Sequence, residues 1–334
     1  MTTEIDPPLV TLAEVRAAAE RLRGIAVRTP LVQFGPPADR RFLKAESLQP
    51  IGAFKLRGAY AAISTLPPEA LARGVITYSS GNHGQGVARA ARLLGAPAVV
   101  VMPSDAPAVK RERIALDGAQ IVVVGTASDE RQQVAEEIAA KRGLAIIPPF
   151  DDDRIIAGQG TIGLELVDDL PDLAVVLVPI GGGGLASGVA VAVRALRPEV
   201  RVIGVEPELA ADARDSLFKG EIVSWPAELV SRTIADGTRT QAIGVRNFAH
   251  LSALLDSIVT VSEIEIAAGV RIAAERSRLV VEPSGALAVA ALAFHARQLG
   301  LDRVDGPIVA IVSGGNVDPE RYLEFLDAPV PLEG

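Results

Sequence analysis

The chain has 334 residues, of which 49% are hydrophobic, and its formal net charge of −8 is spread along the sequence. This length can bury one large core or two moderate ones. An acidic balance without a basic block argues against a nucleic-acid surface. The absence of cysteine excludes disulfides, thiolate catalysis and thiolate metal sites. No apolar stretch has the length of a signal peptide or of a membrane span, so we expect a soluble, cytoplasmic protein.

Strand-like and helix-like stretches alternate from Gly74 onward. Short β-branched runs (GVITYS, PAVVVMP, QIVVVG and LAIIP) are separated by amphipathic stretches, and the rhythm returns after Asp153 with AVVLVPI, VRVIGVEP and PIVAIVSGG. This rhythm is typical of βαβ units, and runs this apolar predict a parallel sheet covered by helices on both faces. The sequence therefore predicts an α/β fold built on twisted, mainly parallel sheet.

Two proline-rich breaks divide this pattern into two lobes. They lie at residues 66–68 and 148–153, where the chain can cross from one lobe to the other. We expect residues 1–68 and 151–334 to form a large domain, and residues 69–150 to form a small, mobile domain.

Three apolar strands each end in a glycine-rich turn. The turns are YSSGNHGQG at residues 78–86, PIGGGGLASG at 179–188 and IVSGGN at 311–316. Ligands of open α/β sheets bind at such strand ends. A helix follows the first two turns directly, so unpaired backbone N–H groups and the positive end of the helix dipole point at the turn. Glycine also lets a phosphate group approach the backbone closely, so the sequence predicts two anion sites.

The second turn also fits a dinucleotide fingerprint. Gly181, Gly183 and Ala186 satisfy G-x-G-x-x-A after a strand, and Glu206 ends the next strand, where a ribose-binding acid would lie. This unit lies in the middle of the chain, however, and a nicotinamide or flavin site leaves the other two turns without a role. For any single turn, a purely structural strand-to-helix connection also stays open.

Lys55 is the most unusual of the five lysines. It lies in GAFKLRGAY, at the predicted start of an amphipathic helix and beside Phe54. The helix dipole disfavours a cation in the first turn, which argues against an ordinary surface lysine. A lysine placed against the dipole and next to an aromatic ring is a candidate for a lowered pKa and for Schiff-base chemistry.

Eight motifs follow one another in an order that a known family shares: GAFKLRGA, SSGNHGQG, AGQGTIGLEL, PIGGGGLASG, VEPELAADA, TIADG, VEPSGA and SGGNVD. In these motifs the chain resembles the fold-type II pyridoxal-phosphate enzymes, in the branch of threonine and serine dehydratases and serine racemases. The likeness runs over nearly the full length. It implies two lobes of twisted, mainly parallel sheet covered by helices, similar to the β subunit of tryptophan synthase.

The resemblance implies a site for pyridoxal 5'-phosphate. Lys55 is implied to bind the cofactor covalently, Phe54 and Asn82 to contact the pyridine ring, and Ser313 to hydrogen-bond the pyridine nitrogen. The phosphate is implied to lie on Gly181, Gly182, Gly183, Gly184 and Leu185. The substrate carboxylate is implied to lie on Ser79, Ser80, Gly81, Asn82 and His83. The large domain then binds the cofactor, and the small domain carries the carboxylate-binding loop.

The resemblance also implies a reaction, the β-elimination of water and ammonia from L-threonine or L-serine to give a 2-oxo acid. An uncharged serine at the pyridine nitrogen makes the ring a weaker electron sink, which suits elimination, and Lys55 is expected to remove the Cα proton. Ser80 resembles the serine that returns a proton in serine racemases, so racemisation stays open. Arg131 aligns with an arginine near the substrate entrance of those enzymes, so 3-hydroxyaspartate stays open as a substrate. An ordinary solvated arginine on a helix is the alternative for Arg131, and base rates favour it. A non-catalytic cofactor-binding protein is the last alternative, and the intact Lys55 argues against it.

A divalent cation is expected on Glu206, the carbonyl of Ala210 and Asp212. The segment EPELAAD brings a second carboxylate back within six residues, and oxygen ligands of this kind suit Mg²⁺ or Ca²⁺. The spacing also resembles the cation site of the serine racemase branch. A ribose-binding Glu206 and a helix cap before Ala213 are the alternatives. We further expect a homodimer that acts on a small hydroxy-amino acid.

Overall fold

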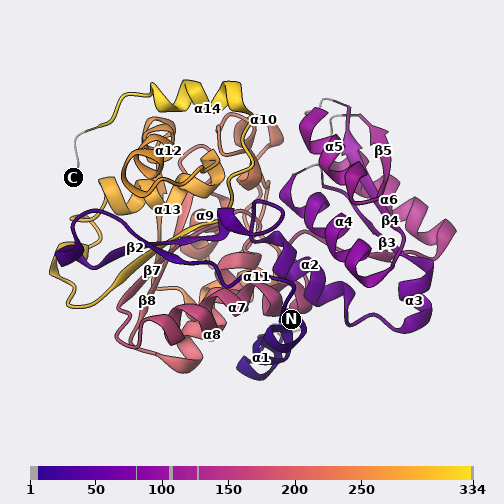
Figure 1. Ribbon diagram of the computed structural model, residues 1–334, viewed down its shortest axis with the longest axis horizontal. Coiled ribbons are helices and arrows are strands. Elements are labelled where there is room, and N and C mark those ends of the chain that lie inside the picture. The colour runs from indigo at the N-terminus through magenta and orange to yellow at the C-terminus, as the bar shows by residue number, and fades with distance from the viewer. Residues whose placement is uncertain (1–6, 80, 105–107, 126–127, 332–334) are drawn as a thin grey trace.

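The computed structural model describes residues 7–79, 81–104, 108–125 and 128–331. Within these residues the strands form one sheet of six strands and one of four, and Figure 1 shows them in two lobes. The predicted α/β fold with mainly parallel sheets is confirmed. In the described part of the chain, no helix is long and apolar enough to cross a membrane.

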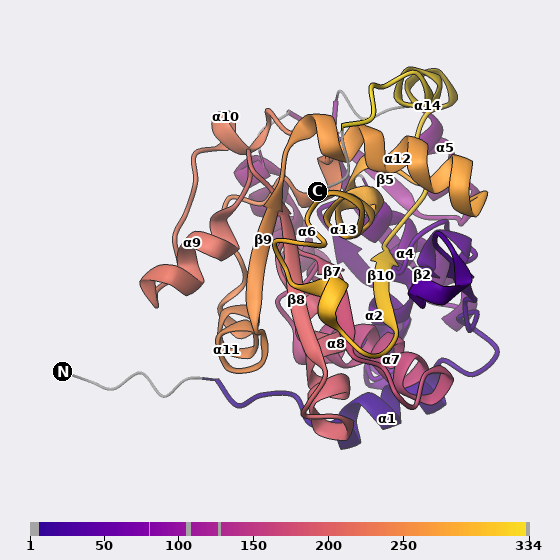
Figure 2. The same cartoon turned by 90° about the vertical axis from the view of Figure 1, so that its left-hand side faces the viewer.

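The larger sheet is parallel except at one edge. In order across the sheet, its strands are β1 (Leu31–Gln33), β2 (Arg41–Ala45), β10 (Ile308–Val312), β7 (Val175–Pro179), β8 (Arg201–Pro207) and β9 (Ser257–Val261). Only β1 and β2 pair in the antiparallel sense. Figure 2 shows β9, β8, β7 and β10 side by side in this order. A strand from the start of the chain therefore lies next to one from its end, with Arg41 opposite Ile308.

The smaller sheet comes from one continuous part of the chain. In order across the sheet, its strands are β5 (Gln120–Val124), β4 (Ala98–Pro103), β3 (Val75–Thr77) and β6 (Ala145–Ile146). All of these strands pair in the parallel sense. They all lie within residues 69–150, the segment expected to form the small lobe.

Helices cover both faces of the larger sheet. In the described residues, the helices of both lobes are α1 (Leu12–Arg21), α2 (Lys55–Ile63), α3 (Pro68–Arg73), α4 (Asn82–Leu94), α5 (Ala108–Leu116), α6 (Ser128–Arg142), α7 (Asp153–Asp169), α8 (Gly184–Leu196), α9 (Asp212–Lys219), α10 (Ala227–Val230), α11 (Val245–Leu254), α12 (Glu263–Ser277), α13 (Pro283–Phe294) and α14 (Pro319–Leu326). Of these, α3 to α6 pack on the smaller sheet. Alternate residues of β7 face opposite ways. Val175 and Leu177 pack with α12 and α13, whereas Val176 and Val178 pack with α7 and α8. This two-sided burial is why the strands are apolar without alternation.

The helix α2 lies between the two lobes. Leu56 and Ala59 pack in the core of the smaller lobe, together with Val100 of β4. On another side, α2 meets α7 so closely that a Cβ on Gly158 would lie 2.7 Å from the carbonyl oxygen of Arg57. The first residue of this helix, Lys55, is therefore placed where the two lobes meet.

Candidate active site

The amine of Lys55 points at the segment that connects the smaller lobe back to the larger one. Its Nζ donates to the carbonyl of Pro149 (2.8 Å) and lies 5.1 Å from the centroid of the Phe54 ring. Burial lowers the pKa of Lys55 to about 8, because the charged form loses its hydration. More of the amine is therefore neutral near pH 7 than in an exposed lysine, which favours its use as a nucleophile or base.

The glycine loop of residues 181–185 joins β7 to α8. Gly183 is the N-cap of α8, with a φ of 99° that favours glycine, and no side chain caps the helix. The N–H groups of Gly181, Gly182 and Gly183 donate to no acceptor in the described part of the chain. Gly184 and Leu185 form the first turn of the helix. A helix start with unpaired N–H groups binds a phosphate well, so the loop fits the phosphate of pyridoxal 5'-phosphate.

Phe150 connects the glycine loop to Lys55. A Cβ on Gly182 would lie 2.2 Å from a ring carbon of Phe150, and one on Gly184 would lie 3.1 Å from the Phe150 Cβ. The phenyl ring therefore covers the loop at a distance that only glycine permits. The preceding residue, Pro149, accepts the hydrogen bond from Lys55. The sequence predicted residues 148–153 only as a crossing between the lobes. No local pattern in them indicated that they contact both the Lys55 amine and the glycine loop.

Asn82, the first residue of α4, lies against the third glycine turn. A Cβ on Gly314 would lie 3.1 Å from Asn82 Nδ2, and Ser313 immediately precedes this glycine. Asn82 Nδ2 donates to Glu282 Oε1 (2.6 Å), and Asn82 Oδ1 accepts from Asn316 Nδ2 (2.7 Å). The structure thus brings together two residues predicted for the pyridine ring. Glu282 lies in the motif VEPSGA, but no role in the site was predicted for it.

The first glycine turn forms the start of α4. Gly81 is the N-cap without a side-chain cap, and its N–H donates to the hydroxyl of Ser79 (3.4 Å). A Cβ on Gly84 would lie 2.1 Å from the carbonyl oxygen of Ser79, so the turn folds tightly onto the helix. This helix start is a second place for an anion. Ser80, which was predicted for the same loop, lies outside the described residues.

His83 is buried next to this turn and is neutral. Its Nε2 donates to the carbonyl of Ile147 (3.0 Å), and its Nδ1 has no partner among the described residues. Burial and the neighbouring charge of Lys55 lower the pKa of His83 to about 3. His83 therefore brings no positive charge to the carboxylate-binding loop near pH 7 and holds the loop to the end of β6 instead.

The residues predicted for a cation lie together at the end of β8. Glu206 accepts hydrogen bonds from the N–H groups of Ala213 (3.0 Å) and Arg214 (2.8 Å). It therefore caps the start of α9, which was one of the predicted alternatives. Both carboxylate oxygens of Asp212 are buried without a partner in the described residues. Burial and Asp212 raise the pKa of Glu206, and burial raises the pKa of Asp212 to about 7. Ala210 is also buried.

This arrangement fits a cation with few protein ligands. The described residues hold no group of three or more His, Asp or Glu side chains that could bind a metal ion. A cation at this place would therefore rest on the carboxylates of Glu206 and Asp212 and the carbonyl of Ala210. The feature that favours it is a pair of neighbouring buried carboxylates, which a cation could hold charged together.

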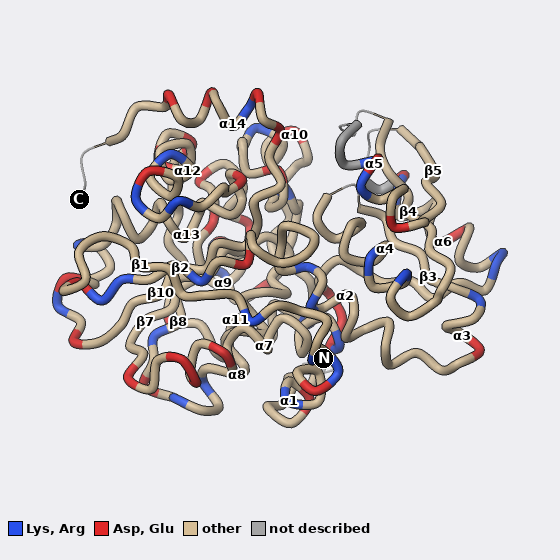
Figure 3. Tube along the Cα trace, in the orientation of Figure 1, with Lys and Arg blue, Asp and Glu red and all other residues tan. Residues whose placement is uncertain are grey.

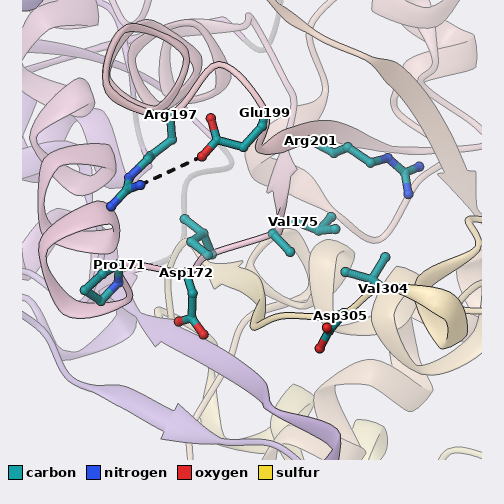
Figure 4. A pocket seen from close by; sticks show the side chains of 10 residues that line it. Pro171, Asp172, Val175, Arg197, Glu199, Arg201, Val304 and Asp305 are labelled. Carbon is teal, nitrogen blue, oxygen red and sulfur yellow. Dashed lines mark ion pairs between the residues drawn. The ribbon is translucent and has the colours of Figure 1, made fainter.

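A depression of about 490 Å³ lies at the amino ends of the strands of the larger sheet, away from the glycine turns at their carboxyl ends (Figure 4). It is lined by residues that precede β7, β8 and β10, including Asp172, Arg197 and Val304. Arg197 lies 3.9 Å from Glu199, so charges of both signs meet there. Ligands of parallel sheets bind at the carboxyl ends of the strands, so this depression is not the candidate active site.

Charges of both signs also mix over the rest of the molecule. Figure 3 shows Lys and Arg interspersed with Asp and Glu over both lobes.

The parallel α/β fold, a largely buried lysine at a helix start and an uncapped glycine loop together suit an enzyme that uses pyridoxal phosphate. The family described as "Pyridoxal-phosphate dependent enzyme" matches residues 22–314, and the chain belongs to this family. Pyridoxal phosphate is therefore favoured over a dinucleotide as its cofactor.

Within the family, the chain is similar to ammonia-lyases and to serine racemases. It is 40% identical over 320 residues to the L-threo-3-hydroxyaspartate ammonia-lyase of Saccharomyces cerevisiae (95% of this chain, 96% of the relative). It is 44% identical over 308 residues to the L-threonine ammonia-lyase of Geobacter sulfurreducens (91% of this chain, 75% of the relative). Among solved structures, maize serine racemase matches with a TM-score of 0.89 and 35% identity, over 95% of this chain and 97% of that chain. The predicted branch of fold-type II enzymes is thereby confirmed.

Proposed function

We propose that this protein eliminates water from L-threonine or L-serine, and that the resulting enamine takes up water again and gives a 2-oxo acid and ammonia. The proposal is carried by Lys55, whose pKa burial lowers to about 8. Its backbone packs against Gly86 of α4, and its amine binds Pro149, whose neighbour Phe150 packs on the glycine loop before α8. Neither helix start has a side-chain cap. Such helix starts suit two anions, the cofactor phosphate and the substrate carboxylate. Relatives at 40% and 44% identity that are ammonia-lyases support elimination.

The chain's own groups divide the work of this reaction. Pyridoxal phosphate, when bound, supplies an electron sink for the substrate carbon that loses its proton. Lys55 binds the cofactor and takes the Cα proton on its Nζ, because a neutral amine with a lowered pKa is a suitable base. The N–H groups of residues 181–185 hold the phosphate, and residues 79–83 hold the substrate carboxylate. Phe54, Asn82 and Ser313 orient the pyridine ring.

Two other reactions use the same groups. Serine racemisation requires a second acid on the opposite face of Cα, and Ser80 is the residue proposed for it. Elimination from 3-hydroxyaspartate requires a cation for the second carboxylate, and Arg131 of α6 is the residue proposed for that contact. A non-catalytic cofactor-binding protein has no need of a lysine with a lowered pKa, so it is the weakest alternative.

A substrate screen with the holoenzyme tests the proposal. Serine, threonine and threo-3-hydroxyaspartate are offered as both enantiomers, and 2-oxo acid and inverted amino acid are measured for each. We expect kcat/KM for 2-oxo acid to be highest with L-threonine or L-serine and to exceed inversion. Lys55→Ala should lower turnover by about 10²–10⁴-fold, the usual contribution of a positioned base.

Each other outcome selects an alternative. More D-serine than pyruvate from L-serine would favour the racemase, and the highest kcat/KM with 3-hydroxyaspartate would favour that ammonia-lyase. Borohydride reduction followed by peptide mapping should place the cofactor on Lys55. Cofactor fixed on Lys55 without turnover of any substrate would leave only the binding protein.

We also propose that Glu206, the Ala210 carbonyl and Asp212 bind Mg²⁺ or Ca²⁺. The unpaired, buried carboxylate of Asp212 supports this proposal, because a buried charge without a partner is strongly unfavourable. The cytoplasmic location and the homodimer stay predictions.

A further inference from the structure

A buried ion cluster lies on the far side of α2 from the small lobe. Its members are Lys44 on β2, Glu46 in the short 3₁₀ helix that follows, Arg57 on α2 and Glu165 on α7. Lys44 and Glu46 are 0% exposed and Arg57 is 1% exposed. The reaction proposed above gives these four charged groups no role.

Arg57 uses every donor of its guanidinium group in this cluster. Nε and Nη2 each donate to one oxygen of Glu46 (2.8 Å), and Nη1 and Nη2 donate to the two oxygens of Glu165 (2.7 and 3.0 Å). The hydroxyl of Thr161 and the carbonyl of Val27 accept further bonds (3.1 Å). Because the guanidinium fork is planar and rigid, two bidentate contacts define its orientation in space.

The formal charges of the cluster, two positive and two negative, sum to zero. Burial opposes the charge on Glu46, but Arg57 outweighs this effect and lowers the pKa of the carboxyl group. Burial likewise opposes the charge on Arg57, whereas Glu46 and Glu165 raise its pKa. Lys44 Nζ binds Glu165 Oε2 (2.6 Å). Buried ion pairs of this kind are often no more stabilising than apolar side chains of similar volume, so stability alone does not account for the cluster.

Lys55 lies between two anchors of α2. On its N-terminal side, the N–H of Phe54 donates to the carbonyl of Ser313 (3.1 Å). On its C-terminal side, Arg57 holds Glu46 and Glu165, which belong to the larger lobe. Rotation of α2 about its axis is therefore blocked at Arg57, and such a rotation would carry the Lys55 amine away from the carbonyl of Pro149.

We propose that Arg57 is a positioning residue, which fixes the rotation of α2 through Glu46 and Glu165 and thereby aims the amine of Lys55 at the cofactor. The inference rests on the proposed role of Lys55 but is independent of the substrate.

The test measures the Lys55 amine directly. Competitive labelling with an amine-reactive reagent over a range of pH, followed by peptide mapping, gives the titration midpoint of each lysine in the cofactor-free protein. The exposed Lys219 is the internal standard. We expect the wild-type midpoint of Lys55 at about 8. In Arg57→Met, water reaches the amine and the midpoint should rise by about one to two units toward the ordinary lysine value.

Lys44→Met is the matched control. It removes the other buried cation of the cluster, but from β2 instead of α2, so it should lower the melting temperature without moving the Lys55 midpoint. Arg57→Lys and Glu46→Gln keep part of the contacts and should give intermediate midpoints. In the holoenzyme, the absorption band of the bound cofactor should change in Arg57→Met and keep its position in Lys44→Met.

The outcomes separate positioning from general stability. An unchanged Lys55 midpoint in folded Arg57→Met overturns the proposal, as does an equal shift in Lys44→Met. If Arg57→Met does not unfold cooperatively, the same criteria apply to Arg57→Lys and Glu46→Gln. Failure of the proposed reaction gives a different result. No hydroxy-amino acid would then yield a 2-oxo acid, but the titration midpoint of Lys55 would still depend on Arg57.

Discussion

Burial sets the charge of the two basic side chains at the candidate site. It lowers the pKa of Lys55 to about 8 and, together with the charge of Lys55, the pKa of His83 to about 3. Both shifts favour the neutral form, because a buried cation without a carboxylate partner loses its hydration. The positive potential for two anions therefore comes mainly from backbone N–H groups at helix starts.

Acid should destabilise the protein partly through His83. Its folded-state pKa of about 3 lies below its ordinary value of 6.5, so between these values the unfolded chain binds a proton that the folded chain does not. This contribution to stability is present above pH 6.5 and is lost as the pH falls toward 3, by about 1.4 kcal/mol per pH unit at most.

The measurement is urea unfolding of the cofactor-free protein at pH 7 and pH 5. We expect His83→Gln to lose about 2 kcal/mol less than the wild type between these two values, since it carries no titrating ring. An equal loss in both proteins would show that His83 is protonated in the folded state as readily as in the unfolded one.

Single residues were predictable from the sequence where their signal is local. Lys55 could be identified because a cation at a helix start beside an aromatic ring is unusual. The residues that form this pattern, Phe54 and Lys55, are neighbours in the sequence. Its partner Pro149 is 94 residues away, and Glu282 is 200 residues from Asn82. Contacts over such separations depend on how the lobes pack, so no local pattern revealed them.

At the scale of elements, the start of α8 owes its shape to what packs on it. Four consecutive glycines exceed what a tight turn requires, and the structure gives a reason. The ring of Phe150 lies where a side chain on Gly182 would otherwise extend, and the Cβ and backbone of Phe150 lie where one on Gly184 would. The sequence predicted the anion site from glycine and helix position, but the covering ring comes from a different part of the chain.

Gly182→Ala should weaken cofactor binding. The added Cβ would lie 2.2 Å from the Phe150 ring, so either the ring or the loop must move. Overpacking of this kind costs about 1–3 kcal/mol, which corresponds to an increase in Kd of about fivefold to 150-fold. Titration of the cofactor-free protein with pyridoxal 5'-phosphate, followed by absorbance, measures this increase.

A double variant serves as the control. Gly182→Ala combined with Phe150→Leu should recover much of the affinity, because leucine is smaller than phenylalanine and leaves room for the methyl group. Wild-type affinity in Gly182→Ala alone would show that the loop tolerates a side chain and that the ring does not determine its shape.

At the scale of the whole molecule, the sequence predicted the architecture but not the strand order. Each βαβ unit is encoded by residues that follow one another, so the α/β class and the parallel sheets could be predicted. The position of β10 between β2 and β7 depends on pairing between the two ends of the chain. Hydrophobic periodicity carries no information about such partners.

Removal of a divalent cation should lower the stability of the whole protein. A cation that binds only the folded state stabilises it by about 2.7 kcal/mol at a concentration of 100 times its Kd. We therefore expect chelation to lower Tm, and Mg²⁺ or Ca²⁺ to restore it, in the wild type but not in Asp212→Ala. Differential scanning calorimetry at constant pH measures this effect. If the wild type also fails to respond, Glu206 is a helix cap and nothing more.

The place of β10 in the larger sheet also governs when this sheet can form. During synthesis, β2 (Arg41–Ala45) is made long before its parallel neighbour β10 (Ile308–Val312), because nearly all other strands lie between them in the chain. All four strands of the smaller sheet lie within residues 75–146. Even its longest-range pair, β3 with β6, spans far less of the chain than β2 with β10, and pairs of lower sequence separation form faster. The nascent polypeptide can therefore complete the smaller sheet on the ribosome, while one edge of β2 stays open to aggregation until the C-terminal strand is released.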